Sequence, residues 1–386
     1  MPVHKLYPDG IKSAVLRYFI PRRDMRRVLI FKETLLPVSE TFILAQMNSL
    51  RNYRPLLAGL EQTPRSLPLP EPLLLARGTG RSMSLRAKIY RRTGFAPTFH
   101  KRARRFGPDL LHAHFASGGL TAIRMARALG IPLLVTLHGA DITVRGAAAK
   151  YEMLVEGAAR FICVSNYIRD RALAAGFQAE KLIVHYIGVD RTLFPPVKAR
   201  PSTGVVFVGR LVEKKGCQYL LRAMGRVQRE HPQCTLEVIG DGPLRKELEE
   251  LARFLNLKCT FLGILPASAV RHHLAHARVV CVPSVTAENG DTEGLPIILA
   301  EAQAMGLPVV STMHAGIPEM IEPGVTGFLV AERDYKAMSE ALVRLLSDDT
   351  LWDAFHRAAI GRIAEQFDLS KQTEVLEHIY NGVLST

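Results

Sequence analysis

Cysteine is scarce in this chain of 386 residues, and it never occurs in a C-x-x-C pair. The five cysteines stand far apart, and most of them lie in short apolar runs: Cys163, Cys217, Cys234, Cys259 and Cys281. Structural zinc sites and redox-active disulfides need closely spaced cysteines, so neither is expected. We expect five reduced, buried thiols, which is typical of a cytosolic protein.

Long hydrophobic runs are also absent. No apolar stretch reaches the roughly 18 residues that a membrane-spanning helix needs, and residues 1–20 lack the charged start, apolar core and small-residue cleavage site of a secretory leader. With 48% hydrophobic and 22% charged residues, the composition is unlike that of a disordered protein. We therefore expect two buried cores, in two domains of ordinary size.

Acidic residues are missing between Arg77 and Arg105, a stretch that contains ten lysines and arginines. The formal net charge of +14 is the sum of +19 over residues 1–200 and −5 over residues 201–386. Residues 81–92 interleave apolar side chains with five cations: Arg81, Arg86, Lys88, Arg91 and Arg92. A basic amphipathic helix of this kind favours an anionic membrane surface as partner. Nucleic acid, which we do not favour, and a solvated basic face without a partner are the alternatives.

Short apolar segments alternate with helix-like segments along the whole chain. The strand-like segments are residues 28–32, 109–115, 132–138, 160–165, 181–187, 205–209, 234–240, 259–263, 279–283 and 308–311. This alternation predicts an α/β fold of two Rossmann-like, doubly wound domains, with parallel sheets and ligand sites at the carboxyl ends of the strands, facing each other across a cleft.

A polar stretch with three prolines at residues 194–204 interrupts the alternation, and we interpret it as the linker between the domains. We assign residues 1–195 to the first domain and 196–365 to the second. Residues beyond 334 are mostly helix-like. A C-terminal helix at 366–386 is expected to pack back on the first domain.

Two glutamates separated by seven residues, Glu293 and Glu301, form the most informative pattern of the chain. Gly294 lets the backbone approach a ligand, Pro296 suits the start of a helix, and Gly306 suits its end. A helix that begins beside a glycine loop binds anions at its N-terminus. A loop carboxylate and a solvated helix residue are the plain alternative, but Glu301 lies in an otherwise apolar helix, where an unpaired charge is costly.

Two cations follow the first strand of the second half. Arg210 and Lys215 lie between Gly209 and Gly216, after a strand and before a helix. This arrangement indicates a clamp for a diphosphate, with an ordinary basic turn as the alternative. After the next strand, Gly240 begins a Gly-Asp-Gly-Pro turn that does not match G-x-G-x-x-G, so we interpret it as a structural turn that lines the same site.

Histidines end two strands of the first half. His138 precedes a glycine at a strand end, where it is placed to bind a sugar hydroxyl or to stabilise developing charge. Asp141 either caps the following turn or binds substrate. His112 and His114 alternate on one strand, and without converging carboxylates we expect packing rather than metal binding.

Taken together, these motifs resemble the retaining, GT-B-fold glycosyltransferases of family 4, over most of the chain. Ser39-Glu-Thr-Phe-Ile43, His138-Gly-Ala-Asp141 and Ile187-Gly-Val-Asp190 look like a subgroup that builds bacterial exopolysaccharide, as in colanic-acid-type transferases. Many members carry a Gly-Gly pair after the first strand, whereas residues 32–40 contain no glycine here.

The resemblance implies specific roles. Catalytic roles fall to His138 and Glu293, and the donor site would be formed by Gly209, Arg210, Lys215, Gly240, Gly294, Leu295, Pro296 and Glu301. Arg210 and Lys215 would hold the donor diphosphate, Glu293 the transferred sugar and Glu301 the ribose.

The implied activity is transfer of a sugar from a UDP- or GDP-linked donor to a lipid-linked or glycan acceptor, with retention of configuration and without a cofactor. The chain has no Asp-x-Asp motif, which is consistent with independence from metal. The expected location is the inner face of the cytoplasmic membrane. Two alternatives remain: a phosphorylase or epimerase on the same fold, and a basic membrane- or nucleic-acid-binding protein with a vestigial site.

Overall fold

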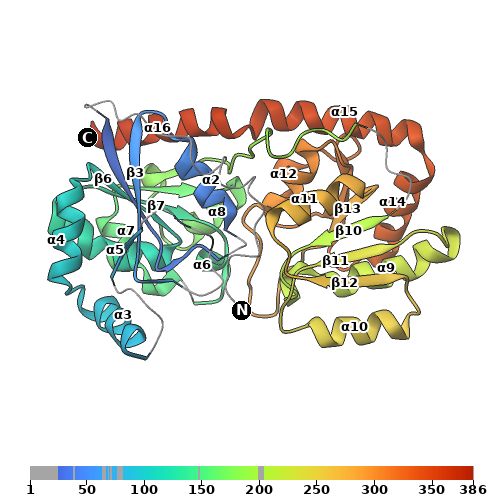
Figure 1. The fold of residues 1–386 in the computed structure, drawn as a ribbon, viewed down its shortest axis with the longest axis horizontal. Coiled ribbons are helices and arrows are strands. Elements are labelled where there is room, and N and C mark those ends of the chain that lie inside the picture. The colour runs from blue at the N-terminus through green and yellow to red at the C-terminus, as the bar shows by residue number, and fades with distance from the viewer. Residues whose placement is uncertain are drawn as a thin grey trace.

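A computed structural model of the chain describes residues 25–37, 40–62, 67, 69, 72–75, 81–146, 148–198 and 204–385, without the side chains of residues 81–84 and 148. These residues form two α/β domains that lie next to each other along the long axis of the molecule (Figure 1). The strands of the first domain are β1 (Arg26–Phe31), β2 (Thr34–Leu35), β3 (Tyr53–Gly59), β4 (Glu61–Gln62), β5 (Leu73–Leu74), β6 (Leu110–His114), β7 (Leu133–Leu137), β8 (Arg160–Cys163) and β9 (Leu182–Val184). Its helices are α2 (Thr41–Ser49), α3 (Arg81–Thr93), α4 (Pro97–Phe106), α5 (Ala116–Leu129), α6 (Ala140–Thr143), η2 (Ala148–Lys150), α7 (Glu152–Gly157), α8 (Asn166–Ala174) and η3 (Ala179–Lys181).

Seven strands of the first domain form one parallel sheet in the order β5-β3-β1-β6-β7-β8-β9, and β2 and β4 pair separately. The register aligns Leu29 of β1 with Leu56 of β3 on one side and with Leu111 of β6 on the other. The strand order reverses between β1 and β6, because β3 and β5 are added on one side of β1 and β6 to β9 on the other. In such a sheet, the crevice at the carboxyl ends beside the reversal is the natural ligand site.

The second domain repeats this plan with six parallel strands in the order β12-β11-β10-β13-β14-β15. Its strands are β10 (Val205–Val208), β11 (Leu236–Ile239), β12 (Cys259–Gly263), β13 (Val279–Val282), β14 (Val309–Thr312) and β15 (Gly327–Val330). Its helices are η4 (Glu213–Lys215), α9 (Cys217–Glu230), α10 (Arg245–Phe254), α11 (Ala267–His276), α12 (Ile297–Ala304), α13 (Ile317–Met320), α14 (Tyr335–Ser347) and α15 (Asp349–Gln366), and α16 (Leu369–Leu384) follows. The predicted pair of doubly wound domains is thus confirmed.

Alternate strand residues pack against helices on opposite faces of each sheet, as the two-residue period of a strand requires. Leu29 and Phe31 of β1 belong to the core beneath α3, α4 and α5, whereas Val28 and Ile30 pack with α2 and α16. In the second domain, Phe207 of β10 lies in the core formed with α9 and α14. These buried sheets hold the loops at their carboxyl ends in place.

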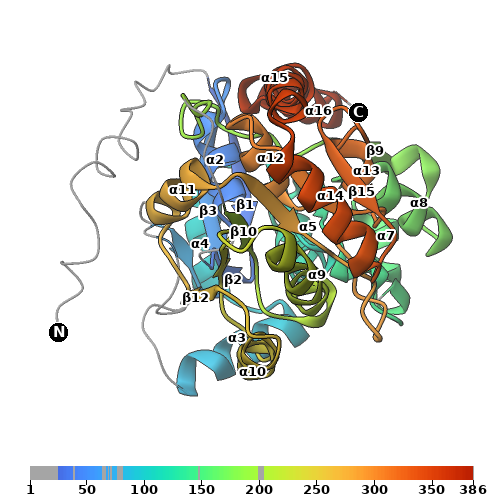
Figure 2. The same cartoon turned by 90° about the vertical axis from the view of Figure 1, so that its right-hand side faces the viewer.

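The last helix returns to the first domain (Figure 1). Glu377 of α16 accepts hydrogen bonds from the backbone nitrogens of Arg51 at 2.6 Å and Asn52 at 2.8 Å. Tyr380 lies fully buried in the core of the first domain. Both Figure 1 and Figure 2 place α3 and α10 at the edge of the molecule opposite α15 and α16.

The strands predicted from apolar runs are all present, and their ends agree with the predicted ones to within three residues. Five strands were not predicted: the two-residue strands β2, β4 and β5, and the longer strands β3 and β15. Pro55 argues against a strand, yet it pairs with Val28 within β3. β15 is only four residues long and begins with Gly327. Residues 199–203 of the predicted linker and Ser39 lie outside the described residues.

The expected burial of the thiols holds for four of the five cysteines. All five cysteines are free, and four are buried, with Cys259 partly exposed. Burial raises the pKa of the Cys163 thiol to about 12, so that thiol stays protonated at neutral pH. Within the described ranges, no helix combines the length and the apolar character that crossing a membrane requires.

Candidate active site

Polar side chains from both domains meet where the carboxyl ends of the two sheets face each other. Backbone contacts join the loop after β7 to the loop after β13. Arg145 N donates a hydrogen bond to the Asn289 carbonyl oxygen at 3.1 Å, and Thr292 N donates to Thr143 Oγ1 at 3.2 Å. The two domains therefore form one continuous site at this point.

Gly294 lies at a close contact between the two domains. A β-carbon at this position would lie 2.0 Å from the carbonyl oxygen of His138. The Gly294 carbonyl oxygen accepts a hydrogen bond from Ser165 Oγ at 3.2 Å. Any side chain at position 294 would collide with the first domain, so glycine lets His138 and Glu293 reach the same site from opposite domains.

Glu293 is buried and ion-paired. Its Oε1 lies 2.8 Å from Lys215 Nζ and accepts a hydrogen bond from Ser284 Oγ at 3.3 Å. Burial acts to raise the pKa of this carboxyl, but Lys215 and Lys214 outweigh burial, and the pKa lies below its ordinary value. Glu293 is therefore a permanent negative charge at neutral pH.

A histidine that the sequence did not single out fixes the backbone of Glu293. The Glu293 backbone nitrogen donates to His314 Nε2 at 3.1 Å, and His314 Nδ1 donates to Glu332 Oε1 at 2.6 Å. Glu332 also accepts a hydrogen bond from Thr286 N at 2.9 Å. These bonds require the neutral tautomer of His314 with the proton on Nδ1, and they hold the loop before α12 rigidly.

Lys214 is a second residue that sequence reasoning missed. Its Nζ lies 2.8 Å from Asp291 Oδ1 and 3.1 Å from the carbonyl oxygen of Thr292. It thereby ties the loop after β10 to the loop that carries Glu293. The two consecutive lysines in the sequence were the signal for this role, because consecutive residues in a turn can form ion pairs with two neighbouring carboxylates.

The glycines after β10 and β11 permit close packing beneath the site. The Lys215 side chain passes over Gly209, whose added β-carbon would lie 3.4 Å from Lys215 Cδ. Gly240 has a φ of 134°, and a β-carbon there would lie 1.9 Å from the Gly209 carbonyl oxygen. Gly240 therefore supports the turn below Lys215, which agrees with the structural interpretation of the Gly-Asp-Gly-Pro motif.

Arg210 is exposed, and its guanidinium makes no hydrogen bond or ion pair within the described part of the chain. It acts electrostatically on Glu40 of the first domain, whose carboxylate it stabilises. Arg210 thus faces the other domain. The two predicted clamp residues are near each other in the loop, but Lys215 is already neutralised by Glu293.

Helix α12 starts next to Glu293. Pro296 is its N-cap residue, no side chain caps the helix, and Leu295 is buried. Glu301 lies in the second turn and is half-buried. Burial raises the pKa of its carboxyl to about 7, against the opposing charge of Arg271 on α11. Within the described residues, no hydrogen bond or ion pair connects the Glu301 side chain to the charges around Glu293, and Arg271 is the charge that acts on it.

His138 sits between two aromatic rings at the end of β7. Its ring centroid lies 4.4 Å from that of Phe115 and 5.3 Å from that of Phe42. His138 Nε2 lies 3.1 Å from His114 Nδ1, within hydrogen-bond distance. Burial, with the charges of His112 and Lys32, lowers the pKa of His138 to about 3. The imidazole is therefore neutral at physiological pH.

Asp141 holds the loop of His138 rather than capping a helix. Its carboxylate accepts hydrogen bonds from the backbone nitrogens of Ala116 and Gly139, both at 2.9 Å, and of His138 at 3.1 Å. Because these bonds connect the ends of β6 and β7, Asp141 positions His138.

Packing explains His112 of β6, as expected. His112 is fully buried, and its two ring nitrogens lie 2.7 Å from Tyr380 Oη and from Thr136 Oγ1. Across the described residues, no three histidine, cysteine, aspartate or glutamate side chains are arranged to hold a metal ion.

The predicted cations of α3 differ in their surroundings. Arg86, Lys88 and Arg92 are exposed, whereas the side chain of Arg81 lies outside the described residues. Arg91 pairs with Glu33 at 3.4 Å and with Glu61 at 3.2 Å. Arg91 therefore attaches α3 to the loop that follows β1, and the other three remain accessible.

Two family models match this chain. Residues 53–193 match the model described as Glycosyltransferase Family 4, and residues 202–348 match the model described as Glycosyl transferases group 1. Each model covers one of the two domains, and together they include His138, Lys215, Glu293 and Glu301.

Individual relatives agree with these models. The chain is 34% identical over 258 residues to the putative colanic acid biosynthesis glycosyltransferase WcaL of Escherichia coli K12, which covers 64% of this chain and 63% of that protein. It is 33% identical over 291 residues to the amylovoran biosynthesis glycosyltransferase AmsK of Erwinia amylovora, covering 71% of each chain. The fold resembles Anabaena HepE, solved with UDP and glucose, with a TM-score of 0.74 and 20% identity over 92% of this chain and 99% of that one. By its sequence and its two-domain fold, the chain belongs to the family 4 glycosyltransferases.

Proposed function

We propose that the chain transfers a hexosyl group from a UDP-sugar to a hydroxyl group of a glycan or lipid-linked glycan, with retention of anomeric configuration and without a metal or cofactor. The observation that carries this proposal is the buried Lys215 and Glu293 pair, which meets His138 of the other domain at Gly294. The names of the WcaL and AmsK relatives support a place in exopolysaccharide synthesis, and the UDP complex of HepE supports a uridine donor.

In this proposal, positive charge binds the donor diphosphate. Arg210 is exposed and unpaired within the described residues, and the N-terminus of α12 has no side-chain cap. Guanidinium groups bind phosphate with paired hydrogen bonds, and helix N-termini favour anions. Arginine and lysine stabilise the charge that develops on a leaving diphosphate, as a metal ion does elsewhere. Glu301, half-buried and without a hydrogen bond in the described structure, is suited to the ribose hydroxyls.

The same geometry suits the transferred sugar. Glu293 stays charged and accepts hydrogen bonds from sugar hydroxyls, while the Lys215 ammonium beside it faces the diphosphate. Neutral His138 can donate or accept one hydrogen bond, but it cannot supply a positive charge. Retention then follows if the acceptor attacks on the face that the diphosphate leaves, with its proton passing to a diphosphate oxygen.

The decisive experiment is thermal unfolding with UDP-glucose, UDP-galactose, GDP-mannose and ADP-glucose, in a buffer that contains EDTA. A ligand present at about 100 times its dissociation constant adds roughly 2.7 kcal/mol to the free energy of unfolding. We expect a shift with the UDP-sugars and release of UDP on incubation. A shift with GDP-mannose alone would correct the donor base, and no shift with any donor would contradict the proposed function.

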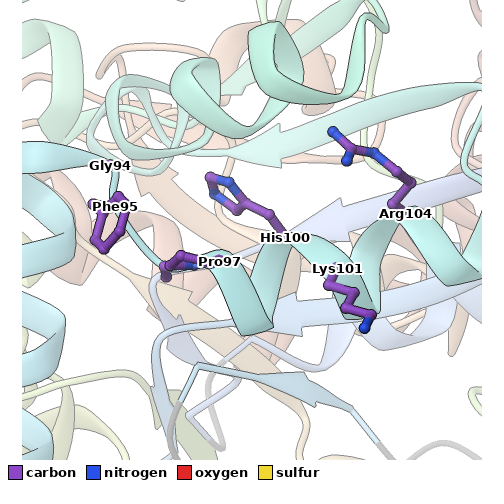
Figure 3. A pocket seen from close by; sticks show the side chains of 7 residues that line it. Gly94, Phe95, Pro97, His100, Lys101 and Arg104 are labelled. Atoms are coloured by element: carbon purple, nitrogen blue, oxygen red, sulfur yellow. The ribbon is translucent and has the colours of Figure 1, made fainter.

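We further propose that α3 and the start of α4 bind an anionic membrane, which would supply a lipid-linked acceptor. Three apolar side chains are unusually exposed here: Leu85 at 58%, Ile89 at 47% and Phe95 at 73%. Figure 3 shows Phe95, His100, Lys101 and Arg104 around one surface hollow. Apolar side chains that enter the headgroup region, together with cations that attract anionic lipid, are typical of peripheral membrane helices.

The position of this surface supports an acceptor role. Arg91 connects α3 to Glu33, in the loop that follows β1 and leads toward the site. Sedimentation with phosphatidylglycerol vesicles should be strong at low salt and weak at high salt, and phosphatidylcholine vesicles should bind little. The double change Leu85→Ser and Ile89→Ser should reduce binding about tenfold. Leu173→Ser, at another exposed leucine, is the matched control, and equal effects of both variants would contradict the membrane proposal.

A further inference from the structure

An ion pair between the two ends of the glycine-free loop 32–40 lies at the carboxyl end of the first sheet. Lys32 follows β1 directly, and its Nζ lies 3.1 Å from Glu40 Oε1 at the start of α2. The side chains are only 14% and 13% exposed. Both flank the reversal of strand order between β1 and β6, where a doubly wound sheet has its ligand crevice.

Two polar atoms at this place are buried without a partner. Glu40 Oε2 and His114 Nε2 have no hydrogen-bond partner among the residues that the structure describes. His114 is only 2% exposed and ends β6, the neighbour of β1. Buried polar atoms are almost always hydrogen-bonded, because an unmade bond in the interior is costly. Unpaired atoms on two adjacent elements therefore indicate a missing hydrogen-bonding ligand.

The surroundings place these atoms toward the second domain. Burial raises the pKa of Glu40, while Lys32 and, from the other domain, Arg210 act to lower it. Lys32 Nζ lies 4.6 Å from the centroid of the Phe115 ring, which in turn lies beside His138. Glu40 thus faces the predicted donor clamp at Arg210 from the opposite side, and aromatic rings flank the space beside it.

We propose that Glu40 binds the acceptor, its free Oε2 accepting a hydrogen bond from the sugar hydroxyl that attacks the donor. This inference rests on the glycosyl transfer proposed above and assigns the acceptor side of that site. A neutral polyol fits, since a carboxylate accepts hydroxyl hydrogen bonds while Lys32 and Arg210 balance its charge. In the reaction, the acceptor oxygen forms a bond to C1 of the donor sugar and the bond from C1 to the diphosphate breaks. The hydroxyl proton passes to the leaving diphosphate, so Glu40 orients the hydroxyl and ends unchanged.

The test compares Glu40→Gln with the wild-type protein, using the UDP-sugar that gives the largest thermal shift. Methyl and octyl glycosides of glucose, galactose and mannose serve as acceptor probes. We expect kcat/KM for the acceptor to fall about 10- to 100-fold, the effect of losing a hydrogen bond to a charged group. Hydrolysis of the UDP-sugar without acceptor, and the UDP-induced thermal shift, should stay within about threefold of wild type, because they need only the donor side.

The control is Glu374→Gln, which removes the carboxylate of an exposed pair with Arg51 on the far helix α16. Exposed ion pairs contribute little to stability, so this variant should match the wild-type protein in stability and in its kinetics with the acceptor. If Glu40→Gln unfolds because Lys32 loses its partner, the double variant Lys32→Gln and Glu40→Gln, which removes both charges, is measured instead of the single variant. A preference for octyl over methyl glycosides identifies a lipid-linked acceptor, and no preference identifies a soluble glycan.

Three outcomes would overturn the assignment of Glu40. These are unchanged acceptor kinetics in the variant, an equal loss of donor hydrolysis, and failure of the wild-type protein to use any of the six glycosides while it hydrolyses the UDP-sugar. A wild-type protein that neither binds nor hydrolyses UDP-sugars would overturn the proposed function itself, and the role of Glu40 with it.

Discussion

Lys215 Nζ lies 2.8 Å from Glu293 Oε1, and this ion pair joins the loop after β10 to the loop before α12. Both side chains are largely shielded, at 14% and 9% exposure. A pair this buried is costly to break, because the remaining charge loses its partner without regaining water. The proposed donor half of the site is therefore built around one fixed charge pair.

Replacing Glu293 by glutamine should reduce turnover much more than nucleotide binding. The variant keeps the shape of the side chain but loses the charge beside the transferred sugar, so kcat should fall about 100-fold or more. The UDP-induced thermal shift should change little. Glu288→Gln, an exposed glutamate in the same loop, is the control, and equal losses in turnover and binding for Glu293→Gln would refute a transition-state role.

Replacing Lys215 by methionine should destabilise the protein in a pH-dependent way. In the wild type the pKa of Glu293 is lowered, so the stability from this group is present above its ordinary pKa of 4.5 and is lost as the pH falls through the lower folded value. Without Lys215, burial would raise that pKa instead. We expect a loss of about 3 kcal/mol at pH 7, and a much smaller loss near pH 4, where the carboxyl becomes protonated.

Urea unfolding of both proteins at pH 4, 5.5 and 7 measures this difference. Lys214→Met is a useful comparison, because its partner Asp291 is 20% exposed and its loss should cost less. A pH-independent difference between wild type and Lys215→Met would show that lost packing, rather than the buried charge, accounts for the effect.

Replacing Glu301 by glutamine should stabilise the free protein at alkaline pH. Burial raises the pKa of this carboxyl to about 7, so its contribution to stability is present below pH 4.5 and is lost as the pH rises through 7. The partial exposure of the side chain reduces the effect, and we expect a gain of about 1–2 kcal/mol at pH 8 and almost none at pH 4.

The same variant tests the ribose assignment. Loss of a charged hydrogen-bond acceptor should weaken UDP binding about tenfold or more. Glu340→Gln, at an exposed position of α14, should change neither property. Gained stability with unchanged UDP affinity would show that Glu301 is buried for a reason other than nucleotide binding.

Alanine at position 294 should push the domains apart. Its β-carbon would lie 2.0 Å from the His138 carbonyl oxygen, so the contact between the two halves of the site must open. We expect a loss of about 1–3 kcal/mol in the free energy of unfolding and a strong loss of turnover.

Gly361→Ala is the control, since no atom outside its own helix lies within 4 Å of the added carbon. That change should stabilise α15 by about 0.5–1 kcal/mol. Retained activity in Gly294→Ala would contradict the need for this close approach.

Local sequence patterns were sufficient for the repeating unit of the fold. Polar or glycine residues bound the short apolar runs that form β6, β7, β10 and β13. This pattern predicts buried strands. β3 was missed because Pro55 argues against a strand, yet β3 lies inside the sheet between β5 and β1, and its pairing with β1 sets its register. In that case, tertiary pairing decided against local propensity.

The sequence by itself determined the two doubly wound domains and the residues proposed for the donor site, because motifs such as the paired glutamates and the Gly-Arg and Lys-Gly turn lie within continuous segments. Only the tertiary structure decided which distant groups meet. It brought His314 beneath Glu293, Arg210 opposite Glu40, and Tyr380 of the last helix onto His112. These contacts join segments that are far apart in the chain, and their geometry depends on how sheets and helices pack. No local pattern records that packing, so a residue such as Glu40 shows its unpaired oxygen only in the folded protein.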